Sequence, residues 1–437
     1  MPPVQDENRW RRIVEECFRR EAGPQASIPD LSQDLIETGV LDSMSWVSFL
    51  RSMESASGIS DLGAMLTEHT PSLESIFQVF KEAQKKSQTE SASRDVGPSA
   101  ATAPAIRAPV ILASSCAVVG SRTIPSEDVA RAFGMPPGKL RLRAGIESLA
   151  YAAEDENELT LGARAAQQAL HAAACGAQEL DWIIATSETH HSYPSLAARL
   201  HSQLLARETC GALDVGGACL GLLNGLAVAQ GLIASGQARA IAVITADVHS
   251  RILSPGRVAG EFGGLFGDGA SAFLLRANNG SERDDSVPQQ AYTLGEFFFG
   301  CAGQYAGAIR VAQVPDGNLD VHFDGEALSR AAITRLEKVI LDAELRSGIP
   351  RTSLQGLATH QPNPRLVTLL AKQCSLPEDK FPPVAQTFGN LGSSTCGVAL
   401  DAILQASRGR HTERNGPIFL ASLGPGLLFG GGWLVPA

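Results

Sequence analysis

The sequence lacks the signatures of several large classes of protein. Its eight cysteines show neither CxxC pairs nor the Cys/His spacing of a metal site, so we predict no metal centre. In a chain of 437 residues without a disulfide framework, such cysteines favour reduced thiols and a cytoplasmic location. There is no excess of positive charge either. The formal net charge of −10 argues against a nucleic-acid partner.

Membrane and secretory signals are missing as well. The first residues, "MPPVQDENRWRR", mix both signs of charge and precede no apolar segment, so we expect no signal peptide. No apolar run reaches the roughly 18 residues that a membrane span needs. The longest candidate starts at Leu220 and contains Asn224 and Gln230, which favours a buried helix. What is present, 44% hydrophobic residues and 43 glycines, is typical of a packed globular enzyme.

A segment rich in Ser, Ala, Pro and charge divides the chain. It shows no apolar period, and we interpret residues 87–108 as a flexible linker. Before it, residues 1–86 form a small unit, and after it residues 109–437 form a large one. A flexible linker of about 25 residues has a root-mean-square reach of roughly 25–30 Å.

The small unit is predicted to be a helical bundle. Apolar residues recur at helical spacing in the segments 9–22, 43–54 and 72–86. The apolar face expected on the second helix consists of Met44, Val47, Leu50 and Met53.

The large unit alternates between strand-like and helix-like segments. Apolar runs such as "DWIIATSE", "AIAVIT" and "ASAFLLR" are separated by helical patterns, which predicts an α/β fold with largely parallel, buried strands. The pattern also repeats: a glycine-rich turn, a small-residue helix and a strand occur first after Asp214 and again after Thr387. We therefore predict two similar halves, at about 109–277 and 290–437, with two equivalent turns at the centre.

Three residues in this pattern can do chemistry. Cys219 follows two glycines and opens a helix, where the helix dipole can lower a thiol pKa from about 8.5 to roughly 3.5–7.5. His360 follows a short apolar strand, and Asn390 lies in the second glycine-rich turn. Taken singly, a buried core cysteine, a structural histidine and a turn asparagine remain open interpretations. Their order along the repeat is more specific than any one of them.

The large unit resembles the ketoacyl synthase III-type enzymes of the thiolase superfamily. The resemblance covers most of residues 110–437. It implies a thiolase-like duplicated α/β/α/β/α fold and a homodimer formed through this unit. It also implies that Cys219 accepts an acyl group and forms a Cys-His-Asn triad with His360 and Asn390. The segments that carry the resemblance are "PSLAARLHSQL", "ALDVGGACLG", "ADVHSR", "LFGDGASA", "HFDGEAL", "HQPNPRL" and "GNLGSS".

The reaction implied is decarboxylative Claisen condensation of an acyl thioester, from acyl-CoA or a carrier, with a malonyl thioester. His360 and Asn390 would donate hydrogen bonds to the enolate. One departure leaves an alternative open. In ketoacyl synthases the residue at the position of Pro425 commonly donates a backbone N–H to the acyl oxyanion, and proline has none. A non-condensing acyltransferase, acting on a hydroxyl, an amine or a second carrier, is the alternative. The intact triad argues against a third possibility, a non-catalytic scaffold that docks carriers.

The small unit resembles acyl or peptidyl carrier proteins. The segment "GVLDSMSWVSFL" matches their attachment motif, which implies that a phosphopantetheinyl transferase attaches 4'-phosphopantetheine covalently to Ser43. The plain alternative is that Ser43 only caps a helix, although a capping box is absent because Trp46 stands at its third position. Eight acidic residues and one basic residue lie between positions 29 and 78. They suit docking on a basic partner or simply a solvated helical surface. The fusion implies a role in polyketide or specialised fatty-acid biosynthesis.

Overall fold

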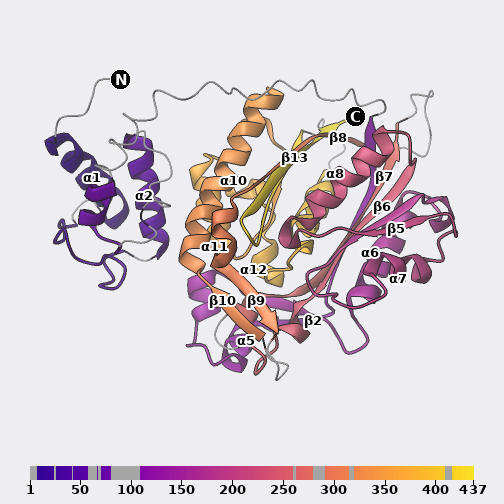
Figure 1. The fold of residues 1–437 in the computed structure, drawn as a ribbon, viewed down its shortest axis with the longest axis horizontal. Helices are drawn as coiled ribbons and strands as arrows, with labels where there is room; N and C mark the ends of the chain where they lie inside the picture. Colours follow the sequence, from indigo (N-terminus) through magenta and orange to yellow (C-terminus); the bar gives the residue numbers. More distant parts are fainter. Residues whose placement is uncertain are drawn as a thin grey trace. The chain divides into compact units, whose positions relative to one another are not determined.

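The structure, a computed structural model, divides into two compact units (Figure 1). The first contains Met1–Pro104 and the second contains the central sheet. The segment predicted to be a linker, 87–108, lies outside the described residues. The structure describes residues 7–23, 26–41, 43–57, 66, 70–79, 109–258, 262–278, 291–313, 319–408 and 416–437.

The N-terminal unit is helical, as its amphipathic segments predict. Helix α1 spans Glu7–Ala22, α2 spans Ser43–Ser57, and residues 73–79 are also helical. Their apolar faces meet in one core, because burial of such faces is what stabilises short helices in water. The fully buried members of this core include Phe18, Leu35, Trp46, Phe49, Met53, Leu73 and Ile76.

A nine-stranded mixed sheet forms the centre of the large unit, in the order β11-β12-β13-β8-β1-β7-β6-β4-β5. Strand β4 is parallel to both of its neighbours, β5 and β6, and β11 is parallel to β12. The other pairs in the sheet are antiparallel, so the prediction of largely parallel strands is wrong. Apolar runs indicate that both faces of a strand are buried, and that burial does not depend on the direction of the neighbouring strands. The strands are β1 Val110–Val119, β4 Trp182–Thr186, β5 Gly211–Asp214, β6 Ala240–Val248, β7 Asp268–Ala277, β8 Tyr292–Cys301, β11 Gly356–Thr359, β12 Ile418–Gly424 and β13 Leu428–Pro436.

Helices cover both faces of this sheet, and the alternation along β6 shows how. Ile241 and Val243 belong to the core shared with α8 and α13, whereas Ala242 and Ile244 belong to the core shared with α6 and α7. Figure 1 shows α8 and α6 on opposite sides of the strands. Because both faces are covered, β6 is apolar along most of its length, as the sequence predicted. The bounds are α6 Glu158–Ala172, α7 Leu196–Leu204, α8 Gly221–Ala234 and α13 Ser394–Arg408.

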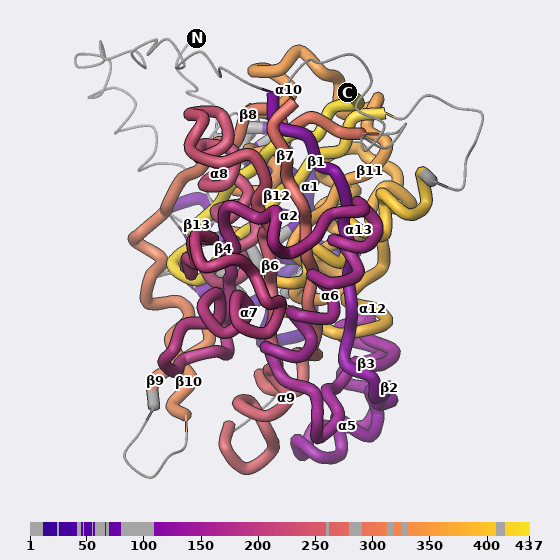
Figure 2. Tube along the Cα trace, turned by 90° about the vertical axis from the view of Figure 1, so that its right-hand side faces the viewer, coloured from indigo at the N-terminus to yellow at the C-terminus, as the bar shows by residue number. Residues whose placement is uncertain are grey.

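Smaller elements lie around the sheet. Figure 2 shows α5, β2 and β3 together at one end of the unit. No helix of the described ranges is long and apolar enough to cross a bilayer. The remaining elements are β2 Arg122–Pro125, α5 Ser126–Ala132, β3 Ser148–Tyr151, α9 His249–Ile252, β9 Ile309–Gln313, β10 Leu319–Phe323, α10 Gly325–Ser347, α11 Pro364–Gln373 and α12 Val384–Phe388.

The order of elements repeats between the two halves of the sheet. In the first half α8 precedes β6, which lies beside the parallel strand β4; in the second half α13 precedes β12, which lies beside the parallel strand β11. The carboxyl ends of these parallel strands, and the turns that begin α8 and α13, are the places where the repeat puts equivalent residues.

Candidate active site

Cys219 lies in a strained turn between β5 and α8. Its predecessors Gly217 and Ala218 have φ values of +124° and +49°, the second of which is unfavourable for a residue with a Cβ. A Cβ at Gly217 would also overlap the Asn224 amide nitrogen. The turn is fixed from the sheet, because Ser422 Oγ on β12 donates a hydrogen bond of 2.7 Å to the Cys219 carbonyl. Cys219 is 8% exposed.

The backbone of His360 is anchored on β12, the strand that also fixes the turn of Cys219. His360 follows β11 directly, and its backbone N–H donates to the carbonyl of Ala421, the neighbour of Ser422, at 3.3 Å. The side chain is buried, and Nδ1 has no hydrogen-bond partner within the described structure. Burial lowers the pKa of His360 to about 4, so its imidazole is neutral at pH 7.

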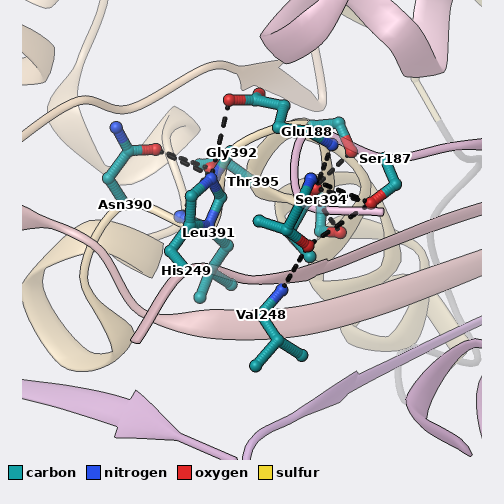
Figure 3. Close-up of polar contacts among 12 residues, drawn as sticks. Ser187, Glu188, Val248, His249, Asn390, Leu391, Gly392, Ser394 and Thr395 are labelled. Carbon is teal, nitrogen blue, oxygen red and sulfur yellow. Dashed lines mark hydrogen bonds and ion pairs between the residues drawn. The ribbon is translucent and has the colours of Figure 1, made fainter. Parts of the chain in front are cut away.

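Asn390 is held in one orientation. Its Oδ1 accepts a hydrogen bond from Gly392 N at 3.0 Å and from Thr395 Oγ1 at 3.3 Å (Figure 3). Its backbone N–H donates to Leu265 and its carbonyl accepts from Gly267 N, each at 2.9 Å. Because the amide oxygen is occupied, the amide NH₂ is the end of this side chain that can donate to a ligand.

A buried ion pair lies beside these residues. Glu188, two residues after β4, faces His249, the first residue of α9, with Oε2 and Nε2 3.6 Å apart (Figure 3). The two side chains are 15% and 5% exposed. The turn of Asn390 packs against the pair: a Cβ at Gly392 would overlap His249 Cε1 and would lie 3.0 Å from Glu188 Oε1.

Asp247, at the end of β6, ties this cluster together. Its carboxylate accepts a hydrogen bond of 2.6 Å from Glu188 N and another of 2.6 Å from Ser393 Oγ. It is fully buried. A single carboxylate thus connects the loop after β4 to the turn that begins α13, and fixes Glu188 relative to Asn390.

The charges of the pair follow from its surroundings. Burial raises the pKa of Glu188, but its interactions with His249 outweigh burial and lower the pKa below its ordinary value. Burial lowers the pKa of His249, but the carboxylates of Glu188 and Asp247 raise it to about 9. Burial raises the pKa of Asp247 to about 6. At neutral pH Glu188 is therefore an anion and His249 a cation.

Comparisons with known proteins support a single family. The family profiles described as 3-oxoacyl-[acyl-carrier-protein (ACP)] synthase III and its C-terminal part match residues 213–292 and 345–435. The β-ketoacyl-[acyl-carrier-protein] synthase III of Haemophilus ducreyi is 30% identical over 298 residues, which are 67% of this chain and 86% of that protein. The chain belongs to the 3-oxoacyl-[acyl-carrier-protein] synthase III family.

Further relatives of this synthase III chain agree. The corresponding enzyme of Granulibacter bethesdensis is 29% identical over 321 residues, covering 73% of this chain and 97% of that one. The crystal structure of 3-oxoacyl-(acyl carrier protein) synthase III from Pseudomonas aeruginosa matches with a TM-score of 0.65 and 24% identity, over 75% of this chain and 99% of that chain. A priming β-ketosynthase of a polyketide pathway matches with a TM-score of 0.66 and 23% identity, over 76% and 97%. The predicted thiolase-like α/β fold is confirmed, and the protein is a ketoacyl synthase III-like enzyme.

One prediction about this synthase III site is wrong. We expected the helix dipole to lower the pKa of Cys219. Instead, burial raises it well above its ordinary value, and the Glu188 and Asp247 carboxylates raise it further. The thiol therefore carries its proton at neutral pH.

The sequence-based predictions assigned no role to Glu188 or His249. The internal repeat is the signal that points to them. Glu188 follows β4 in the first half as His360 follows the equivalent strand β11 in the second. By the same equivalence, His249 follows β6 as Pro425 follows β12.

Proposed function

We propose that this synthase III family member transfers an acyl group through Cys219 and condenses it with a malonyl thioester carried on phosphopantetheine. In the first half-reaction Cys219 takes the acyl group from a thioester of CoA or of a carrier. In the second, decarboxylation of the malonyl group produces an enolate that attacks the Cys219 thioester. His360 and Asn390 donate hydrogen bonds to the enolate oxygen.

The state of the two donors carries this proposal. Decarboxylation places negative charge on a thioester oxygen. The groups that stabilise this charge must each present an N–H that is free to donate a hydrogen bond. His360 is a buried neutral imidazole, and the Asn390 amide oxygen is already occupied by Gly392 N and Thr395 Oγ1. Both groups are thus set as donors, and neither needs water to reorganise around it.

We propose further that residues 1–86 are a carrier domain joined by the segment 87–108 to the condensing unit 109–437. Ser43 would hold 4'-phosphopantetheine, added by a phosphopantetheinyl transferase. Its backbone stands at the first residue of α2, which suits a swinging arm, while its side chain and Asp42 lie outside the described residues. A tethered thioester reaches an effective concentration on the order of millimolar near the site. A homodimer through the thiolase-fold unit, a cytoplasmic location and a polyketide or specialised fatty-acid product complete the proposal.

One observation favours a second candidate, acyl transfer to a hydroxyl, an amine or another carrier without condensation. Pro425 follows β12, and the end of β12 lies beside the turn that contains Cys219, since a Cβ at Gly424 would lie 2.6 Å from the Gly217 carbonyl oxygen. Proline has no N–H for the acyl oxyanion. His360 would then assist the acceptor, and no carbon dioxide would leave.

Release of carbon dioxide separates the two. With carboxyl-labelled malonyl-CoA or malonyl-carrier, we expect release by the wild type that depends on prior acylation of Cys219. Asn390→Ala should still become acylated, but should lose carbon–carbon bond formation by about 10²–10³-fold, the usual effect of losing one oxyanion donor. Asn157→Ala, which removes a helix cap on α6, is the matched control and should condense normally. Transfer to a hydroxyl or amine with no release from any malonyl donor would refute condensation.

A further inference from the structure

We propose that Glu188 is the proton acceptor for the Cys219 thiol during acyl loading, and that His249 and Asp247 are positioning residues that hold its carboxylate in place. This inference rests on the proposed role of Cys219 as the acyl-accepting nucleophile. It adds to the Cys-His-Asn set a carboxylate supplied by the loop after β4.

The Glu188 carboxylate is placed so that one of its oxygens can accept a proton. Its Oε2 faces His249, while its Oε1 is buried and has no hydrogen-bond partner within the described structure. The parallel pairing of β4 with β5 brings the loop of Glu188 beside the turn of Cys219, since Val215 N donates to the Ala185 carbonyl and a Cβ at Gly221 would overlap Thr186 Oγ1. The carboxylate also raises the pKa of the thiol. A buried carboxylate oxygen without a donor is unfavourable by itself, so the arrangement is better explained by a proton that comes and goes.

The Cys219 thiol needs a base. Its pKa lies well above the ordinary value, so the thiolate is scarce at neutral pH. His360 is a poor acceptor because burial lowers its pKa to about 4. Asp247 is engaged by Glu188 N and Ser393 Oγ. The titratable groups that face this cluster within the described residues are Glu188, Asp247, His249, Asp268 and His360.

Transfer of the thiol proton to Glu188 leaves the charge of the site balanced. Before transfer the site holds a neutral thiol, a Glu188 carboxylate and a His249 imidazolium. When the thiol proton moves to Glu188, the site holds a thiolate, a neutral carboxylic acid and the same imidazolium. The total charge of these three groups is unchanged, and the thiolate does not form beside an ionised Glu188. Loss of a proton to solvent would instead leave the thiolate beside the carboxylate.

Acyl loading consumes and then regenerates the Glu188 carboxylate. The S–H bond of Cys219 breaks as its sulfur attacks the carbonyl carbon of the donor thioester, and the proton passes to Glu188. The bond between the carbonyl carbon and the leaving sulfur then breaks. The departing thiolate takes the proton back from Glu188 and leaves as a thiol. Glu188 is returned to its ionised form, and no other reactant is needed.

The test compares acylation with alkylation in the full chain. Single-turnover acylation of Cys219 by acetyl-CoA and by a medium-chain acyl-CoA would be followed by peptide mass spectrometry. Glu188→Gln keeps the shape but cannot take a proton, and should slow acylation at pH 7 by about 10²–10⁴-fold. Glu156→Gln, another buried glutamate in the same unit, is the matched control and should acylate at the wild-type rate.

Alkylation should change in the opposite direction. Removing the anion beside the thiol lowers the pKa of Cys219, so iodoacetamide should modify Cys219 of Glu188→Gln faster than that of the wild type at neutral pH. Partial unfolding would also expose the buried Cys219 thiol and speed its alkylation, so thermal unfolding of Glu188→Gln is measured alongside. Slower acylation together with faster alkylation at a wild-type Tm supports the role of Glu188. Acylation of Glu188→Gln at or above the wild-type rate would overturn the proposal, because Glu188 would then only keep the thiol protonated.

Two further measurements keep the outcome decisive. If Glu188→Gln does not fold, Glu188→Asp retains the charge at a greater distance and should slow acylation by up to about 10²-fold; a wild-type rate would refute the role. Cys219→Ala separates this inference from the proposed function. If the wild-type chain is acylated no more than Cys219→Ala by any donor, the nucleophile assignment itself fails. If Cys219 is acylated equally in both glutamate variants, only the role of Glu188 fails.

Discussion

Gly392 offers the sharpest structural test of the candidate site. It has φ +57°, a value that favours glycine, and it packs against the Glu188–His249 pair. A Cβ there would overlap His249 Cε1 and would lie 3.0 Å from Glu188 Oε1. Gly392→Ala should therefore have two separable effects, a local backbone strain and a displacement of the buried pair.

Gly236→Ala is the control that isolates the second effect. Gly236 follows α8, has φ +78°, and has nothing within 4 Å of its Cβ position. Both substitutions place alanine in the left-handed region, which costs about 1–2 kcal/mol. Only Gly392→Ala adds overpacking of a buried site, typically about 1–3 kcal/mol more. We expect Tm to fall by about 1.5–3 °C in Gly236→Ala and by about 1.5–4.5 °C more in Gly392→Ala, at roughly 1.5 °C for each kcal/mol in a unit of about 330 residues.

The two variants should also differ in chemistry. Thermal unfolding and single-turnover acylation of Cys219 would be measured on both. Gly236→Ala should acylate at the wild-type rate, whereas Gly392→Ala should be at least about tenfold slower because Glu188 and His249 have moved. Equal losses of stability together with equal acylation rates would refute the packing of the Gly392 turn against the pair.

Two other outcomes are expected. A phosphopantetheinyl transferase and CoA should add one phosphopantetheine, located at Ser43 by peptide mapping, and Ser43→Ala should abolish it; addition elsewhere, or none with several broad-range transferases, would remove the carrier assignment. Because the pKa of His249 is raised from 6.5 to about 9, its stabilising contribution is fully present below pH 6.5 and is lost as pH rises through 9. The free energy of unfolding of the wild type should thus fall more steeply across that window than that of His249→Gln, and parallel slopes would contradict the ion pair.

Periodicity predicted elements better than it predicted their faces. The strands at 182–186, 240–248 and 268–277 and the helices of both units fall where the apolar patterns placed them. On α2, Leu50 and Met53 of the predicted apolar face are buried, but so are Trp46 and Phe49, which were not assigned to that face. The side chains of Met44 and Val47 lie outside the described residues. Spacings of three and four residues are both compatible with a helical face, so only the packing partners decide where its centre lies.

The positions of the site residues could be predicted from the sequence, but the ionisation of Cys219 could not. The fold puts Cys219, His360 and Asn390 at the strand ends and turns where the sequence placed them. The pKa of Cys219 could not be predicted from the sequence, because it depends first on burial and then on Glu188, which lies 31 positions earlier and is brought near by the parallel pairing of β4 with β5. The rule that helix N-termini stabilise thiolates describes one local contribution to the pKa of a thiol. It contains no information about burial or about carboxylates from other strands.

The duplication of the fold explains why such a carboxylate occurs where it does. Each half contributes one turn that begins a central helix and two strand ends that meet at it. In the second half these strand ends supply a neutral His360 and a Pro425 without an N–H; in the first they supply Glu188 and His249, which are charged. The two halves thus share an arrangement of strands and turns but differ in the charge of their strand-end residues. In the proposed mechanism the ionised Glu188 takes the thiol proton during acyl loading, whereas the neutral His360 and the Asn390 amide donate to the enolate during condensation. The difference in charge, rather than the shared fold, is what assigns these proposed roles to the two halves.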